Sequence, residues 1–266
     1  MDAVRAALVS APAPAAAASA ADCTERYAAE AESCGARVLC FPEAFLTGYG
    51  TDEGHPQRAL SRHSEVIREV GAIAVRHRLD LLAGFIEVDK EGRRYITHGI
   101  FRPDGTADFY RKTHLGSREK EVFSAGNELP VFTLGCGLRA GIALCVENHY
   151  PEIAQTLSLR GAEVIFAPHA VPGRAADRER IWKTFIPARS YDSRVFMLCC
   201  NLRTDAGGGG IFGTGPDGQE ILPFSAEQGS LSVDIDPCEI ARYHEKTAGM
   251  RFRYYPAQRR GELYEV

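Results

Sequence analysis

Short apolar runs alternate with amphipathic segments along most of this chain, and this alternation restricts the fold more than any other feature of the sequence. The runs that predict buried strands lie at 4–9, 38–41, 81–85, 138–144, 164–167 and 195–200. The segments that predict helices lie at 22–34, 66–77, 151–161 and around 181–191. The first of these helices opens on Asp22 and Glu25, which are spaced like a capping box.

Two Pro-Asp-Gly turns add antiparallel pairs to this order. Pro103–Gly105 separates the strand-like runs 95–101 and 107–111, and Pro216–Gly218 predicts a second, late hairpin. The alternation of strands and helices, together with these hairpins, favours a fold in which helices cover sheets that contain both parallel and antiparallel strands. Because no linker or change of composition divides the sequence, we expect a single domain over residues 1–266.

Charge and hydropathy exclude several classes of partner. Thirty-one Lys and Arg against 35 Asp and Glu give a net charge of −4, which disfavours a nucleic-acid-binding protein. No apolar run approaches the roughly 18–20 residues needed to span a bilayer. Residues 1–20 are apolar, but Pro12 and Pro14 interrupt them, so this segment predicts a strand and a turn rather than a secretory signal.

The eight cysteines give no indication of a metal site or a disulfide framework. They include no C-x-x-C pair and no tight Cys/His cluster, and Gly207–Gly210 lacks the lysine and hydroxyl residue of a phosphate-binding loop. We therefore expect no metal, no cofactor and reduced thiols in a cytoplasmic protein.

Three polar residues stand where predicted strands end. Glu43 follows the run 38–41, Lys112 closes the first hairpin, and Cys145 follows the run 138–144. Each alone is compatible with an exposed charge or an inert buried thiol. Together they form a complete set for acyl transfer, because a carboxylate can deprotonate a thiol and a cation can stabilise the oxyanion that follows. This reasoning also predicts a low pKa for the Cys145 thiol beside the lysine.

The segments around these residues carry a resemblance. FPEAFLTGY (41–49), YRKTHL (110–115) and LCVENHYPE (144–152) resemble, in order and spacing, the three catalytic signatures of the nitrilase superfamily, the carbon–nitrogen hydrolases. The resemblance implies an α/β fold, a four-layer αββα sandwich, and association into a homodimer or a larger homo-oligomer. It also implies that Glu43 is the general base, that Cys145 forms a thioester, and that Lys112 stabilises the oxyanion together with the backbone N–H of Val146.

Many members of that family carry a second carboxylate after the lysine. Glu119 fits this position best through the Phe123 and Gly126 that follow it, and Glu121 is the alternative. A solvated charge on a helix surface is an equally good interpretation of Glu119.

The remaining candidate residues concern the substrate. Those expected to line the site are Val146, Asn148, His149, His169 and Arg174, with Arg178 close by. Such polar and cationic groups favour a small polar or acidic amide or an N-carbamoyl compound, hydrolysed with release of ammonia. The alternatives are that the histidines are packed and the arginines point into water. Nitrile hydrolysis, acyl transfer to an amine, and an inactive relative that binds a metabolite also stay open.

Overall fold

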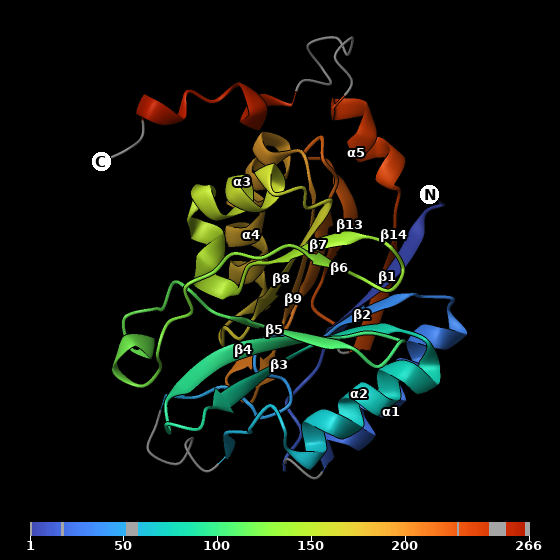
Figure 1. Ribbon diagram of the computed structural model, residues 1–266, viewed down its shortest axis with the longest axis vertical. Coiled ribbons are helices and arrows are strands. Elements are labelled where there is room, and N and C mark those ends of the chain that lie inside the picture. Colours follow the sequence, from blue (N-terminus) through green and yellow to red (C-terminus); the bar gives the residue numbers. More distant parts are fainter. Residues whose placement is uncertain (1, 17–18, 52–57, 228, 245–253, 264–266) are drawn as a thin grey trace.

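Two six-stranded sheets lie face to face, and a pair of helices covers the outer face of each (Figure 1). The computed structural model describes residues 2–16, 19–51, 58–227, 229–244 and 254–263. Helices α1 (Ala20–Ser33) and α2 (Glu65–His77) cover the first sheet, and α3 (Pro151–Leu159) and α4 (Ala175–Ser193) cover the second. The four-layer αββα sandwich implied by the sequence motifs is thus confirmed.

The first sheet joins parallel and antiparallel strands. Its order is β14 (Gly229–Ile235), β1 (Val4–Ser10), β2 (Val38–Cys40), β3 (Asp80–Val88), β4 (Arg94–Phe101) and β5 (Ala107–Arg111). Strands β1, β2 and β3 are parallel, whereas β4 and β5 form the antiparallel hairpin that the turn at Pro103–Gly105 predicts. The hairpin places the end of β5, and with it Lys112, at one edge of this sheet.

The second sheet repeats the same plan. Its order is β13 (Glu220–Ser225), β12 (Ile211–Thr214), β9 (Phe196–Asn201), β8 (Val164–His169), β7 (Arg139–Ile142) and β6 (Phe132–Thr133). Strands β7, β8 and β9 are parallel. The smaller elements are η3 (Glu119–Glu121), η4 (Cys145–His149), the pair β10 (Arg203–Thr204) and β11 (Gly207–Gly208), α5 (Pro237–His244), η6 (Tyr255–Gln258) and η7 (Gly261–Leu263).

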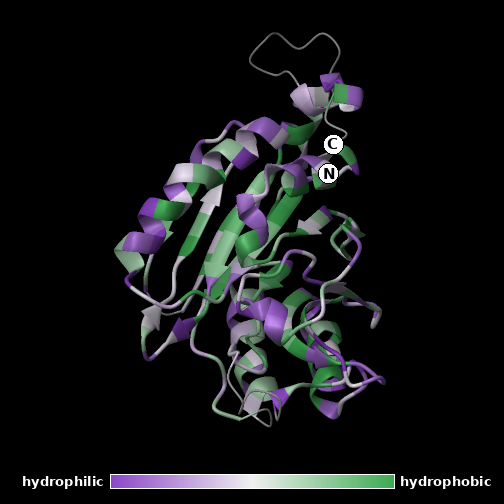
Figure 2. Cartoon of the chain, turned by 90° about the vertical axis from the view of Figure 1, so that its left-hand side faces the viewer, coloured by the Kyte–Doolittle hydropathy of each residue, from purple (hydrophilic) through white to green (hydrophobic). Residues whose placement is uncertain are grey.

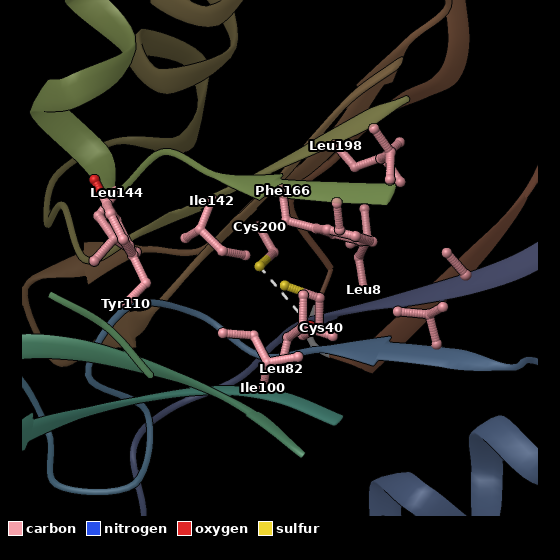
Figure 3. Packing of buried hydrophobic residues seen from close by; sticks show 14 of the residues in the cluster. Leu8, Cys40, Leu82, Ile100, Tyr110, Ile142, Leu144, Phe166, Leu198 and Cys200 are labelled. Carbon is pink, nitrogen blue, oxygen red and sulfur yellow. Dashed lines mark hydrogen bonds between the residues drawn. The ribbon is translucent and has the colours of Figure 1, made fainter. Parts of the chain in front are cut away.

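The main core lies between the two sheets. Figure 3 shows Leu82 and Ile100 from the first sheet opposite Ile142 and Phe166 from the second. Hydrophobic residues concentrate along the strands, and the helices present hydrophilic residues to the outside (Figure 2). Burial of apolar area on both faces of each sheet is the main force that holds the four layers together.

Two local expectations differ from the structure. Helix α1 begins at Ala20 with Ser19 at its N-cap, so Asp22 and Glu25 do not form the expected capping box. The run 138–144 gives a strand only as far as Ile142, because the chain leaves the sheet to form the turn that carries Cys145. Among the described residues, no helix has both the length and the hydropathy to cross a membrane.

Candidate active site

Glu43, Lys112 and Glu119 meet in one buried cluster that Cys145 adjoins. The Lys112 Nζ donates to Glu43 Oε1 at 2.8 Å and to Glu119 Oε1 at 2.8 Å. Glu43 follows β2 and Lys112 follows β5 in the first sheet, whereas Cys145 opens η4 behind β7 of the second. The site therefore lies where the ends of strands from both sheets converge.

A glycine in the neighbouring strand lets the Glu43 turn come close to the sheet. Ala44 has a left-handed backbone with φ of +54°, and its N lies 2.4 Å from where a Cβ on Gly84 would be. The carbonyl of Gly84 accepts from the N–H of Leu46 at 2.9 Å. Only glycine at position 84 allows this approach, which fixes the turn that presents the Glu43 carboxylate.

Cys145 also stands on a left-handed turn. Its φ is +47°, an uncommon conformation for a residue with a side chain. The Asn148 side-chain amide donates to the carbonyl of Ala143 at 2.8 Å and to that of Cys145 at 3.1 Å. Asn148 thus holds the turn from inside, and Cys145 and Val146 are both half-buried.

The electrostatics of the cluster keep the lysine charged. Burial alone would lower the pKa of Lys112, but the charges of Glu43 and Glu119 act against burial and the pKa is raised. Burial raises the pKa of Glu43, and the Lys112 ammonium offsets this only in part. The Oε2 of Glu43 is buried without a hydrogen-bond partner in the described structure, so this oxygen is available to accept a proton.

The expected low pKa of the Cys145 thiol is wrong in direction. Burial and then the Glu43 carboxylate raise its pKa to about 12, against the opposing effects of Lys112 and the backbone N–H of Ala170. The Lys112 charge does lower the pKa of the thiol, but two carboxylates share this cation, and burial together with the Glu43 charge outweighs its effect. The cysteine therefore rests as a thiol and needs a base.

The structure places Glu119, not Glu121, beside the lysine. Besides Lys112, the Glu119 carboxylate accepts from the hydroxyl of Tyr49 at 2.9 Å and from the N–H of Gly116 at 2.6 Å. Glu119 is buried, whereas Glu121 is exposed. Tyr49, which closes the first signature segment, is a member of the site that the sequence did not predict.

The two candidate histidines differ in their surroundings. His169 is buried at the end of β8, where its Nδ1 contacts the carbonyl of Ala167 at 2.7 Å and its Nε2 accepts from Trp182 Nε1 at 3.2 Å. Burial lowers the pKa of His169 to about 3, so its ring is neutral. His149 is exposed and packs against the Phe185 ring at 4.6 Å between centroids.

The two candidate arginines, Arg174 and Arg178, also differ in their exposure and contacts. Arg174 has an 83% exposed side chain and pairs with Asp177 at 2.9 Å, so the structure does not bring it to the cluster. Arg178 is half-buried beside Trp182, with 6.0 Å between its guanidinium carbon and the ring centroid. Its buried Nε has no hydrogen-bond partner within the described ranges. Burial lowers the pKa of Arg178. Its contact with Trp182, which donates to His169 at the end of β8, places this cation on the side of the site where β8 ends.

Residues 5–245 match the family model described as Carbon-nitrogen hydrolase. The chain belongs to this family. A carbon–nitrogen hydrolase relative, the omega-amidase NIT2 of Xenopus tropicalis, is 28% identical over 259 residues, which cover 89% of this chain and 88% of that protein. An (R)-stereoselective amidase of Pseudomonas sp is 29% identical over 214 residues, which cover 77% and 76%.

Solved structures of carbon–nitrogen hydrolases agree with this assignment. An amidase from Nesterenkonia sp. is 25% identical with a TM-score of 0.82, covering 98% of this chain and 94% of its own. A mutant of that amidase with its active-site cysteine replaced by alanine was solved with butyramide, at 25% identity and a TM-score of 0.81, covering 98% and 95%. Cys145 matches the catalytic cysteine of these amidases, so this carbon–nitrogen hydrolase is an enzyme of the amidase type.

Proposed function

We propose that this enzyme hydrolyses small amides that carry a carboxylate or several hydrogen-bonding groups, through a thioester on Cys145, with release of ammonia. N-carbamoyl compounds of similar size and polarity belong to the same class. The observation that carries the proposal is the half-buried Arg178, which packs against Trp182 beside His169 at the end of β8 and whose buried Nε has no hydrogen-bond partner in the described residues.

The first half of the proposed reaction forms the thioester. The Cys145 sulfur attacks the amide carbonyl carbon while Glu43 accepts the thiol proton, which the raised pKa of this carboxyl favours. The carbonyl oxygen becomes an oxyanion that the Lys112 ammonium and the backbone N–H of Val146 stabilise. The C–N bond then breaks, and Glu43 passes its proton to the leaving nitrogen, which departs as ammonia.

The second half restores the thiol. A water molecule attacks the thioester carbonyl while Glu43 removes its proton, and a second oxyanion forms beside Lys112. When this intermediate collapses, the C–S bond breaks, the carboxylic acid product leaves, and the proton returns from Glu43 to the Cys145 sulfur. Glu119 supports both halves because its carboxylate keeps the Lys112 ammonium charged and in place.

The preference for an acidic or polar substrate follows from the cost of leaving the buried Nε of Arg178 without a hydrogen-bond partner. A buried polar group without a partner costs about 1–3 kcal/mol, and more when it is charged. A substrate carboxylate satisfies the guanidinium with charge-assisted hydrogen bonds, whereas an aliphatic amide leaves it unsatisfied. The similarity to omega-amidases supports the same class of substrate.

A matched pair of substrates tests this preference. We expect kcat/KM to be higher for succinamate, the mono-amide of a four-carbon diacid, than for butyramide, which has a methyl group in place of the carboxylate. Arg178→Ala reduces the ratio of the two kcat/KM values about 10- to 100-fold, because a hydrogen bond to a charged group contributes about 1.5–3 kcal/mol. Arg174→Ala, four residues away and exposed, leaves the ratio unchanged.

Other outcomes of the same measurements contradict the proposal. If butyramide is the better substrate of the wild-type enzyme, or if Arg178→Ala and Arg174→Ala behave alike, Arg178 does not select the substrate. An ammonia-release screen that includes nitriles and N-carbamoyl compounds, repeated with hydroxylamine as an alternative acceptor, separates amide hydrolysis from nitrile hydrolysis and from acyl transfer to an amine.

We also propose that the enzyme forms a homodimer or larger homo-oligomer in the cytoplasm. The side chains of Tyr150, Tyr191 and Tyr255 are about two-fifths exposed, from the α3, α4 and η6 region, and offer an apolar surface to a second copy. All eight cysteines are free thiols, as expected in a reducing compartment. Light scattering on the purified chain measures the oligomeric state, and a monomer at micromolar concentration contradicts the proposed homo-oligomer.

A further inference from the structure

Glu147 is a buried carboxylate to which the mechanism above gives no role. It lies in η4, two residues after Cys145, and its Oε2 accepts from the backbone N–H of Leu144 at 2.6 Å. Its Oε1 accepts from both the backbone N–H and the hydroxyl of Thr113, each at 2.7 Å. One carboxylate therefore joins the residue directly before Cys145 to the residue directly after Lys112.

Further donors from the same segment reinforce this bridge. The Tyr110 hydroxyl donates to Glu147 Oε1 at 2.6 Å, and the N–H of His114 does so at 3.3 Å. Figure 3 shows Tyr110 reaching from β5 across the space between the sheets toward Leu144. Because every one of these contacts brings a proton to Glu147, they match an ionised carboxylate, which can only accept hydrogen bonds.

The bridge matters because its two sides belong to different sheets. Lys112 continues β5 of the first sheet, whereas Cys145 follows β7 of the second. Among the described residues no strand pairing joins the two six-stranded sheets, so side-chain contacts across the gap help to set the distance between the ammonium and the thiol. The left-handed backbone of Cys145 adds to this need, since a strained conformation persists only where its surroundings hold it.

We propose that Glu147 is a positioning residue, which fixes the Cys145 turn against the Lys112 segment so that thiol and ammonium keep the separation that attack on an amide carbonyl requires. The proposal rests on the roles proposed above for Cys145 and Lys112. Since it concerns alignment of reacting groups and not contact with substrate, loss of the bridge lowers kcat and leaves KM nearly unchanged.

Glu147→Gln is the first test, because the amide has the shape of the carboxylate but turns an NH₂ group either toward the backbone N–H of Leu144 or toward those of Thr113 and His114. We expect kcat to fall about 10²-fold, the loss that a displacement of about 1 Å produces. The negative charge of Glu147 contributes to the raised pKa of Glu43, so its removal also moves the acid limb of the kcat/KM profile to lower pH. The matched control is Glu121→Gln, which neutralises an exposed carboxylate and changes neither quantity.

Glu147→Asp separates the effect of side-chain length from the effect of the negative charge. It keeps the carboxylate but shortens the side chain by one methylene, so we expect a loss of kcat with the acid limb at its wild-type pH. This variant decides the question if Glu147→Gln does not fold, and a wild-type kcat in either folded variant overturns the proposal. A Glu147→Gln enzyme in which kcat and KM change together and the acid limb stays in place indicates a purely structural role and also overturns it.

Cys145→Ala, measured in parallel, distinguishes this inference from the proposed function. If the alanine variant is inactive and Glu147→Gln has wild-type kcat, only the positioning role fails. If the alanine variant retains turnover, the thioester mechanism fails and the positioning role fails with it.

Discussion

At the scale of single residues, Glu43 and Cys145 have to be considered together. The thiol rests protonated because its pKa is raised to about 12, so the proposed mechanism depends on a deprotonated Glu43. Burial raises the pKa of Glu43 above its ordinary value of 4.5. Activity should therefore be absent where Glu43 is protonated, rise with pH through this raised pKa, and stay level through neutral pH.

The pH dependence of kcat/KM between pH 4 and 9 checks this prediction. Glu43→Gln removes the base and should abolish turnover across the whole range, while circular dichroism stays that of the wild type. An acid limb below pH 4.5, or one that survives in Glu43→Gln, means that another group accepts the proton.

Lys112 gives a second prediction at this scale. Removal of an oxyanion donor costs about 10²–10³ in rate, so Lys112→Met should lower kcat by at least this factor. The variant also leaves Glu43 and Glu119 buried without their shared cation, which should reduce the free energy of unfolding. Lys120→Met, an exposed lysine on η3, is the control and should keep full activity. Urea unfolding and steady-state kinetics measure the two effects, and a kcat within tenfold of wild type contradicts the role of Lys112.

At the scale of elements, the approach of β3 to the Glu43 turn predicts the effect of a single methyl group. Gly84→Ala places a Cβ 2.4 Å from the N of Ala44, so the turn must move. Such overpacking costs about 1–3 kcal/mol of stability, and it should also lower kcat by displacing Glu43. Gly71→Ala in α2 is the matched control, because its Cβ meets only Phe101 at 3.7 Å and alanine favours a helix. Thermal unfolding measures the stability of both variants, and steady-state kinetics measures their kcat. If the two variants have the same stability and the same kcat, the prediction for Gly84 is wrong.

The elements were largely predictable from the sequence, whereas the links between them were not. Several predicted strands match observed ones, namely the runs 38–41, 81–85 and 164–167, and the Pro103–Gly105 turn joins two observed strands. These predictions succeed because apolar periodicity and turn chemistry act locally. The three signature segments likewise predicted Glu43, Lys112 and Cys145 as the catalytic residues. The bridge made by Glu147 depends on its contacts with Tyr110 and Thr113, more than 30 residues away in the chain, which no local pattern encodes.

At the scale of the whole molecule, the space between the sheets holds a titratable group that makes folding sensitive to acid. His98 lies on β4 in the same alternating row as Ile96 and Ile100, which face the second sheet. Burial lowers the pKa of His98 to about 3, and the Leu82 backbone offsets this only in part. The unfolded chain, with an ordinary histidine pKa of 6.5, binds a proton that the folded chain excludes.

The sign of the effect follows from this difference. Between pH 6.5 and 3 the unfolded state holds more protons at this position, so acid lowers the free energy of unfolding. From pH 7 to pH 5 the loss is about 2 kcal/mol for one such histidine. His98→Leu, which keeps the row apolar, should reduce the difference between urea unfolding free energies at pH 7 and pH 5 by that amount. His63→Gln, an exposed histidine, should leave the difference as in the wild type. A His98→Leu enzyme that loses as much stability as the wild type over this range means that His98 is protonated within the fold, and that charge can be accommodated between the two sheets.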